Sequence, residues 1–409
     1  MRRRDSGRAA LAALLIAWTG CAGPTPTERS SLHPLEPTDP VQASHTGRSP
    51  APSPVATSPG GLADEIEVGV LGSEATGDLL EFASTGASIV YSAGGADAAA
   101  GAAPDLWRLT PGPDAVPELA WRNPDRDHSI VRIDGDLDTV AFVEMPVDGE
   151  RAWNLWVLPP DGEAVILDSH PGDETVSSLV PSFSIYEPAI VWTAFDRGPS
   201  GAVSQMLAAS APDWTPRVVA EIPSAEGELW LPSLYGDTVV YTEVRYADDR
   251  RSDERSVLLG SIGLAGEPPR RLDTSGLATM PQIVDDVVVW KEADRGFNMF
   301  NWGRMFRYEL ATGEVSTLDT WPQDHVNYPS AGSRFVAWWG SNSTTLGVYD
   351  LVLDRARLIE RHAPDGRVSA VRPHLRGDLL VWMHADDTLP GRVRELRYAF
   401  LPGVRDLDR

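Results

Sequence analysis

The stretch Pro281 to Trp290 reads Pro-Gln-Ile-Val-Asp-Asp-Val-Val-Val-Trp: a proline, a turn, and an apolar run that ends in an aromatic residue. Such a run occurs seven times along the chain, ending at Tyr91, Phe142, Trp192, Tyr241, Trp290, Trp338 and Trp382. The steps between successive aromatic residues are 51, 50, 49, 49, 48 and 44 residues. Such an even period indicates a repeat architecture.

Each repeat has room for four short strands. In four units a proline stands nine residues before the aromatic residue, and a turn with Gly or Asp lies between them. The fifth unit continues with an alternating strand at 305–310, a turn at 311–314 and a short strand at 315–318. Four short strands in about 45 to 50 residues are typical of one propeller blade. We therefore expect an all-β, seven-bladed β-propeller of four-stranded antiparallel blades, with six blades as the alternative.

The repeated aromatic residues are expected to pack between neighbouring blades, because they lie on second strands that are covered on both faces. A row of ligand-stacking rings is the alternative. Trp214 lies outside the register in a polar stretch, so we expect its truncation to cost far less stability than truncation of Trp290.

Ring closure requires a partner for the last blade, since a free sheet edge invites opening or pairing with other chains. The final unit has three clear strands, near 371–375, 379–383 and 395–400. Residues 65–71 alternate apolar with polar or small residues and belong to no complete unit. We expect them to form the outermost strand of the last blade, beside 395–400. The competing assignment gives that place to 404–408.

The N-terminus has the features of an export signal. Four arginines precede a short apolar run, and the run ends in small residues before Cys21, the only cysteine in the chain. The stretch Trp18-Thr19-Gly20-Cys21 resembles a bacterial lipobox, although leucine is usual where Trp18 stands. We expect a lipoprotein signal peptide at 1–20, with a plain secretory signal as the alternative. Lipidation of Cys21 would anchor the protein to a membrane.

The segment that follows has the composition of a tether. Nine prolines fall within residues 22–60, among Ser, Thr and Ala, which is too little apolar surface to form a core. We assign 21–61 to the lipidated cysteine and a Pro/Ser/Thr-rich tether, and 62–409 to the propeller.

Charge and missing motifs exclude several functions. The chain has 35 basic and 59 acidic residues, a formal net charge of −24, so nucleic acid is not an expected partner. The sequence contains no Gly-x-Ser-x-Gly elbow, no phosphate-binding loop with Gly-Lys-Ser/Thr, no His-Glu-x-x-His and no Cys-x-x-Cys. We expect no cofactor, and binding is favoured over catalysis.

The repeat resembles that of the TolB-like propellers of bacterial periplasmic and archaeal surface proteins. The resemblance rests on Pro281 to Gly296 and on the Trp-x-x-x-Asp-Arg-Gly turn, which Trp192 to Gly198 repeats. It covers about 340 residues, all of the folded part. The chain departs from TolB itself, because the preceding α/β domain and the Ser-Pro-Asp-Gly turns are absent. The resemblance therefore implies a scaffold and no Tol-Pal role.

The least ordinary polar cluster precedes the first strand of the sixth unit, at Trp321 to Pro329. In propellers, the loops that enter the innermost strands surround the mouth of the central channel, so equivalent positions of other units converge there. We predict a ligand site at this mouth for a sugar or a metal, made by Glu228, Trp230, Asp324, His325, Asn327, Arg372 and His374. The alternative is that His325 and His374 are ordinary polar rim residues. The other histidines, including His362 and His384, share no register and define no metal triad.

These observations predict a lipid-anchored, extracytoplasmic β-propeller, periplasmic or on the cell surface, that serves as a binding or scaffold module of the cell envelope. Its expected partners are the membrane, through the lipid anchor, and an envelope protein or glycan. The alternative is a polysaccharide lyase or hydrolase that acts at the channel mouth, and a third possibility is a sensor or assembly factor. A metal at His325 would favour the enzyme.

Overall fold

In the computed structural model of the protein, the described residues are 66–71, 79–93, 104–112, 115–125, 127–147, 151–160, 162–172, 180–198, 201–247, 253–263, 268–273, 275–293, 303–320, 326–340, 345–362, 368–388 and 393–402. The signal peptide, Cys21, the tether and two predicted site residues, Asp324 and His325, lie outside these ranges. Within them, no helix is long and apolar enough to cross a membrane.

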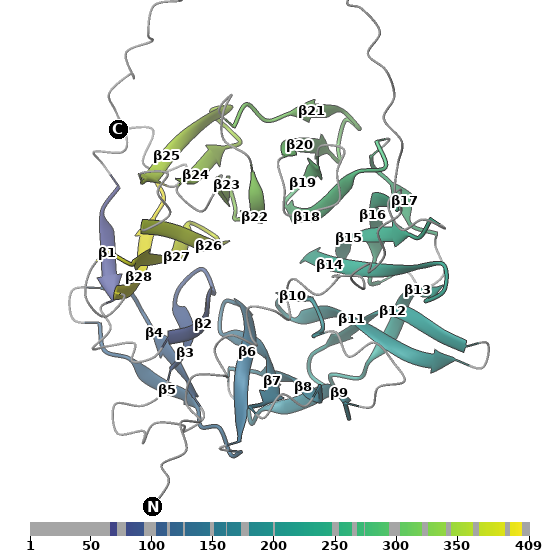
Figure 1. The fold of residues 1–409 in the computed structure, drawn as a ribbon, viewed down its shortest axis with the longest axis horizontal. Coiled ribbons are helices and arrows are strands. Elements are labelled where there is room, and N and C mark those ends of the chain that lie inside the picture. Colours follow the sequence, from purple (N-terminus) through teal and green to yellow (C-terminus); the bar gives the residue numbers. More distant parts are fainter. Residues whose placement is uncertain are drawn as a thin grey trace, which may run out of the picture. The chain divides into compact units, whose positions relative to one another are not determined.

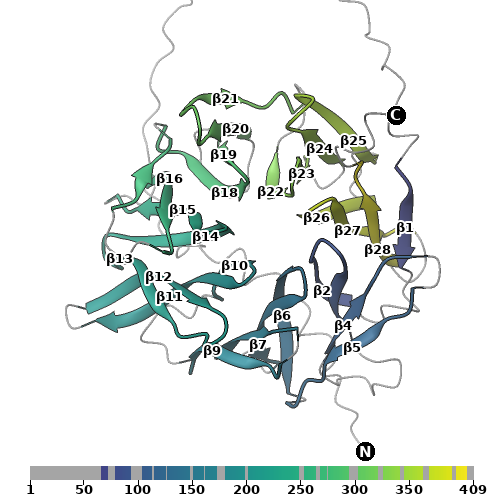
Figure 2. The same cartoon turned by 180° about the vertical axis from the view of Figure 1, so that it is seen from behind.

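Seven separate four-stranded antiparallel sheets form the fold, which confirms the seven-bladed alternative over the six-bladed one. The blades are arranged in a ring with their first strands around the centre (Figure 1), and the view from behind shows the same order (Figure 2). Each inner strand contacts the inner strands of both neighbouring blades, so the ring is closed.

The first four blades follow chain order from the centre outward. Blade 1 consists of β2 (Leu79–Ser84), β3 (Ile89–Ala93), β4 (Asp105–Leu109) and β5 (Glu118–Trp121). Blade 2 consists of β6 (His128–Asp136), β7 (Thr139–Pro146), β8 (Trp153–Leu158) and β9 (Val165–His170). Blade 3 consists of β10 (Phe183–Tyr186), β11 (Ala189–Gly198), β12 (Gly201–Ser210) and β13 (Arg217–Pro223). Blade 4 consists of β14 (Gly227–Tyr235), β15 (Thr238–Arg245), β16 (Glu254–Ser261) and β17 (Arg270–Arg271).

Of the other three blades, two follow the same order and the last combines strands from both ends of the propeller. Blade 5 consists of β18 (Ala278–Val284), β19 (Val287–Ala293), β20 (Gly303–Glu309) and β21 (Val315–Thr317). Blade 6 consists of β22 (Asn327–Ala331), β23 (Phe335–Trp339), β24 (Thr345–Asp350) and β25 (Arg355–Arg361). Blade 7 consists of β26 (Val368–Arg376), β27 (Leu379–Asp386), β28 (Val393–Phe400) and β1 (Val68–Leu71).

The predicted closing strand is confirmed. Strand β1 pairs antiparallel with β28, from Val68 opposite Ala399 to Leu71 opposite Leu396. The side chains of Ile66 and Leu71 pack against the cores on the two sides of blade 7. The competing segment 404–408 lies outside the described residues. An N-terminal strand therefore completes the C-terminal blade.

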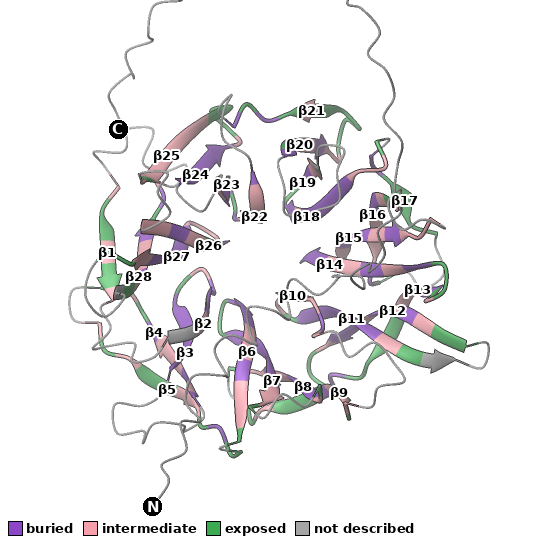
Figure 3. Cartoon of the chain, in the orientation of Figure 1, coloured by how far each residue is buried: buried purple, intermediate pink, exposed green. Residues whose placement is uncertain are grey.

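The repeated aromatic residues form the core between blades, as predicted. Phe142, Trp192, Trp290 and Trp382 are fully buried, and the other three are 1% exposed. The second strands carry β-branched residues around these rings, which suits strands covered on both faces. Burial decreases outward, and the outer strands β1, β5, β17 and β21 are largely exposed (Figure 3).

The expectation for Trp214 is wrong. Its side chain is only 7% exposed and belongs to the apolar core between blades 2 and 3, with Trp153 and Trp192. Trp214 lies in the connection between β12 and β13, in a left-handed backbone conformation with φ of 49°. The turn is polar in sequence but folds its tryptophan inward, so a location outside the repeat register does not imply exposure.

The repeated prolines mark β-bulges in the inner strands of blades 4 to 7. In each of these strands the pairing register shifts at the proline and the residue before it. The residue before the proline has positive φ in all four blades: 50° at Leu231, 54° at Met280, 45° at Tyr328 and 55° at Arg372. Proline suits this place because a bulge leaves a backbone position out of the hydrogen-bonded ladder.

Candidate functional site around the inner strands

Positions counted back from each repeated aromatic residue define two layers at the centre of the ring. We call the residues ten positions before it the mouth ring: Glu81, Arg132, Ser182, Leu231, Met280, Tyr328 and Arg372. We call the residues eight positions before it the inner ring: Ala83, Asp134, Ser184, Ser233, Gln282, Ser330 and His374. Because the blades repeat one arrangement around the ring, equivalent side chains of different blades lie at the same depth.

The mouth ring contains a charged cluster from blades 7, 1 and 2. The Arg372 Nη1 atom donates to Glu81 Oε1 at 2.6 Å. Burial raises the pKa of Glu81, although Arg372 and, more weakly, Arg132 act to lower it. Burial also lowers the pKa of Arg132, while the nearby groups Glu81 and Tyr328 favour its charged form. These four side chains therefore lie within electrostatic reach of one another.

Two members of this cluster differ in what they offer to a ligand. The Arg132 Nη1 atom donates to the backbone oxygen of Pro181 at 2.8 Å. The Arg372 side chain is 48% exposed, while its partner Glu81 is 18% exposed. The left-handed backbone at Arg372 and Tyr328 belongs to the β-bulge that Leu231 and Met280 share, so it is a feature of the repeat. The cluster presents a solvent-accessible guanidinium beside a phenol ring.

The inner ring joins neighbouring blades through a repeated hydrogen bond. The side chain of an inner-ring residue accepts a hydrogen bond from a backbone N–H of the next blade. The donor is the residue that directly follows that blade's own inner-ring residue. The bonds run from Ser84 N to His374 Nδ1 (3.0 Å), Ile185 N to Asp134 Oδ2 (3.1 Å), Leu234 N to Ser184 Oγ (3.2 Å), Ile283 N to Ser233 Oγ (3.1 Å) and Leu375 N to Ser330 Oγ (2.9 Å). Five of the seven inner-ring positions therefore carry a side-chain acceptor that ties one blade to the next.

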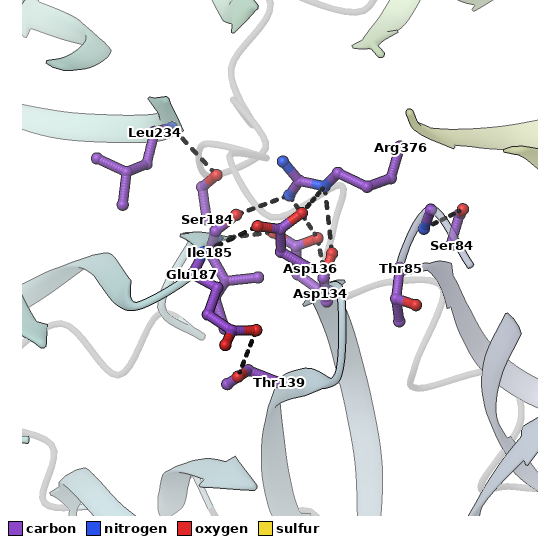
Figure 4. A network of polar contacts seen from close by, with 12 residues as sticks. Ser84, Thr85, Asp134, Asp136, Thr139, Ser184, Ile185, Glu187, Leu234 and Arg376 are labelled. Carbon is purple, nitrogen blue, oxygen red and sulfur yellow. Dashed lines mark hydrogen bonds and ion pairs between the residues drawn. The ribbon is translucent and has the colours of Figure 1, made fainter. Parts of the chain in front are cut away.

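Blade 7 also sends two side chains across the centre of the ring. His374 Nε2 lies 3.1 Å from Asp134 Oδ1 of blade 2. The Arg376 guanidinium donates to the backbone oxygens of Ile185 at 2.8 Å and Gly135 at 3.2 Å, and its Nη2 lies 3.4 Å from Asp134 Oδ1 (Figure 4). The centre is therefore bridged by polar side chains at this depth.

The pKa values of the two aspartates in this network shift in opposite directions. Burial by itself would raise the pKa of Asp134, but Arg376 and the hydrogen bond with His374 outweigh it and hold that pKa below its ordinary value. Burial raises the pKa of Asp136, although Arg376 and the backbone N–H of Glu187 act against it. Thr139 donates to Glu187 at 3.2 Å and continues the network to the turn of blade 2 (Figure 4).

The five residues of the predicted ligand site that the structure describes have different surroundings. Arg372 belongs to the exposed mouth cluster, whereas His374, two residues on, has both ring nitrogens in contacts between blades. Asn327 accepts a hydrogen bond from Lys291, the only lysine of the chain, at 2.6 Å. Glu228 contacts Tyr246 of its own blade.

Glu228 and Trp230 lie on β14 of blade 4, whereas Arg372 and His374 lie on β26 of blade 7, three blades away. The other three residues of the charged cluster in the mouth ring, Glu81, Arg132 and Tyr328, were not among the predicted site residues. The offset of ten residues from each aromatic residue, applied to all seven units, would have found them.

A second polar cluster contains two of the histidines and lies between blades 6 and 7. His362, which directly follows β25, and His384 on β27 both lie close to Glu360. Glu360 Oε2 is 2.9 Å from His362 Nε2 and 3.2 Å from His384 Nδ1. Blades 6 and 7 thus bring together a carboxylate and two histidines that share no register in the sequence.

Comparison with known proteins supports the β-propeller fold and does not point to a particular protein. No protein-family model matches the sequence, and no characterised protein matches it by sequence. A prolyl endopeptidase structure is similar with a TM-score of 0.54 and 14% identity over 80% of this chain. The chain spans about half of that protein, 51% of its length.

Two further structures are similar over nearly their whole length. The β-propeller domain of the Trilobed protease from Pyrococcus furiosus, described as having an open velcro topology, has a TM-score of 0.54 and 11% identity, covering 80% of this chain and 96% of that one. An oligogalacturonate lyase from Vibrio parahaemolyticus has a TM-score of 0.52 and 10% identity, covering 82% and 97%. At these identities the likeness establishes the fold, a seven-bladed β-propeller of the kind found in peptidase propeller domains.

Proposed function

We propose that this protein is a lipid-anchored, extracytoplasmic β-propeller that binds an acidic group of an envelope protein or glycan at the mouth ring. The observation on which this proposal rests is Arg372, which is 48% exposed although its Nη1 atom pairs with Glu81 at 2.6 Å. A planar guanidinium offers five N–H donors in a fork that matches a carboxylate. One of its nitrogens is used by Glu81, and the exposed part of the group faces solvent.

The surroundings favour exchange of partners over a permanent internal ion pair. Glu81 is shielded enough for burial to raise its pKa, so an incoming carboxylate competes with a partner whose charged form is already disfavoured. The phenol ring of Tyr328 lies within electrostatic reach of both Arg132 and Arg372 and provides an apolar face with a polar tip. This combination suits a sugar acid or an acidic side chain.

Membrane attachment rests on the sequence alone. The apolar run before Cys21, the single thiol and the proline-rich tether support an anchored module held away from the membrane. Replacing Cys21 by Ser should release the protein into the soluble extracytoplasmic fraction. Sedimentation of this variant with membranes after a high-salt wash would contradict the lipid anchor.

The ligand is tested by crosslinking the anchored protein in intact envelopes and identifying the captured protein or glycan by mass spectrometry. We expect one stoichiometric partner with the wild type, at least tenfold less with Arg372→Gln, and no loss with Arg361→Gln, which changes an exposed arginine of β25 in the same way. Equal capture by the wild type and Arg372→Gln would refute the mouth ring as the binding site.

The enzymatic alternative, a polysaccharide lyase or hydrolase, shares the scaffold with the oligogalacturonate lyase of Vibrio parahaemolyticus. It requires chemistry at the mouth, where His325 is the predicted metal ligand. Depolymerisation of an acidic polysaccharide that is lost in His325→Ala would favour this alternative, and capture of an intact partner favours binding.

A further inference from the structure

We infer that Glu360, His362 and His384 form a binding site for a zinc ion between blades 6 and 7, separate from the mouth ring. One atom from each residue lies within 4.8 Å of the others. Glu360 comes from β25, the outermost strand of blade 6, and His384 from β27 of blade 7. A metal here would join two neighbouring blades.

The donor set matches zinc in type and spacing. Two imidazole nitrogens and a carboxylate oxygen are common zinc ligands, with bonds of about 2.0 to 2.2 Å. In a tetrahedral site such bonds place neighbouring donor atoms about 3.3 to 3.5 Å apart. Glu360 Oε2 is 2.9 Å from His362 Nε2 and 3.2 Å from His384 Nδ1. These two distances are slightly shorter than that spacing, and the two histidine donor atoms lie within 4.8 Å of each other.

The carboxylate is already held in place by its other oxygen. Glu360 Oε1 accepts hydrogen bonds from Trp382 Nε1 at 3.0 Å and from Arg397 Nη1 at 2.7 Å. Such outer contacts fix the orientation of a metal ligand and are a regular part of metal sites. Oε2 is left for the two histidines, whose rings meet edge to face with centroids 5.2 Å apart.

The local charge favours a cation. The charge of Arg397 is balanced by Glu395, which it contacts at 2.8 Å. Because Arg397 is shared between two carboxylates, Glu360 leaves a net negative charge at the site. Asp386 adds another, because it lies two residues after His384 on the same face of β27. Glu360 and His384 are each 9% exposed and His362 is 17% exposed, so the donors are shielded from bulk water.

The repeat supplies a matched comparison between blades 2 and 3. There Asp168 accepts the indole N–H of Trp192 at 2.8 Å, as Glu360 accepts that of Trp382, and His170 follows two residues later, as His362 does. Ala194 stands where His384 would be, and a cavity of about 440 Å³ is lined by Asp168, His170 and Ala194. This interface keeps the framework of the site but lacks the second histidine.

The inference is tested by zinc titration of the full-length chain with Cys21→Ser, so that no thiol competes. We expect one zinc ion per chain by calorimetry and elemental analysis, and a tetrahedral absorption spectrum when Co²⁺ replaces it. His384→Ala and His362→Ala should each weaken zinc binding at least about tenfold. His170→Ala, the matched change at the other interface, should leave it unchanged.

A thermal measurement gives an independent readout, because a ligand that binds only the folded state raises its stability. Zinc should raise the melting temperature of the starting protein and of His170→Ala, and should have no effect on His384→Ala. Unchanged zinc affinity in both His384→Ala and His362→Ala would overturn the site. Loss of zinc in His325→Ala alone would place the metal at the mouth instead.

Discussion

Arg376 is the residue whose replacement tests the polar network most directly. Its guanidinium is 17% exposed and lies near two carboxylates, Asp134 and Asp136, which are 13% and 11% exposed. Replacing it by glutamine removes the positive charge and the hydrogen bonds to the backbone oxygens of Ile185 and Gly135. Removal of one partner from a buried ion pair costs about 3 to 5 kcal/mol, because the remaining charge is left uncompensated. We expect a loss of about 3 kcal/mol in unfolding free energy at neutral pH, since none of the three groups is fully buried.

The pH dependence of this loss identifies its cause. In the wild type, the pKa of Asp134 is lower in the folded than in the unfolded chain. Its stabilising contribution is therefore complete above an unfolded pKa of about 4 and is lost as the pH falls through the folded pKa. In Arg376→Gln both aspartates lose the positive charge of Arg376, so protonating them relieves the variant. The difference between the two proteins should shrink as the pH falls from about 7 to about 4.

Urea unfolding of both proteins at several pH values measures this difference. Arg304→Gln, which makes the same change at an exposed position of β20, is the control and should shift stability by no more than about 0.5 kcal/mol. A loss in Arg376→Gln below about 1 kcal/mol, or a loss equal at all pH values, would refute the reasoning. Equal effects of the two glutamine variants would mean that the network does not stabilise the ring.

Three further predictions concern the scaffold. Deletion of residues 62–72 removes the closing strand and should sharply lower the melting temperature, whereas deletion of 403–409 should be tolerated; the reverse order would contradict closure by β1. Gly332→Ala should lower the urea midpoint, because its Cβ would overlap a backbone oxygen of blade 7, while Gly112→Ala has open space and should not. Trp290→Ala should cost about 3 to 5 kcal/mol in unfolding free energy by loss of fully buried volume, and a cost near zero would show that the register was misassigned.

The fold was predictable because the repeat is visible in residues close together in sequence. Each apolar run with its aromatic end identifies a second strand that is covered on both faces, and the even spacing between them gives the number of blades. The closing strand could also be predicted, since residues 65–71 alternate like a strand and have no unit of their own. Trp214 was misplaced because nothing in its polar neighbourhood shows which way the side chain turns.

The site was predictable only in part, because its partners are far apart along the chain. His374 contacts Ser84 and Asp134, which are 290 and 240 residues away in the sequence. The sequence shows a histidine next to a proline but does not show these hydrogen-bond partners. The left-handed backbone at Arg372 and Tyr328 depends on a bulge that the proline permits but does not by itself require. Glu360, His362 and His384 meet only because two blades pack face to face.

The distribution of polar contacts around the ring follows from how the chain closes it. Each blade is joined to the next by a chain connection from an outermost strand to the next innermost strand, and β1 makes this connection from blade 7 to blade 1, but no chain connection within blade 7 joins β1 to β28. That strand pairs along four residues, and two of them, Val68 and Val70, are exposed by 40% and 51%. Blade 7 is also the blade that supplies Arg372, His374 and Arg376, which bind blades 1, 2 and 3.

These side-chain contacts therefore reinforce the ring where its covalent continuity is weakest. Serine hydroxyls that accept a single backbone N–H are sufficient at several other junctions, such as Ser184 with blade 4 and Ser233 with blade 5. At the junction of blades 7 and 1, ion pairs and hydrogen bonds to backbone oxygens span up to three blades. Since Arg372 belongs to both the reinforced junction and the proposed ligand site, a ligand that displaces Glu81 from Arg372 would act directly on the place where the ring closes.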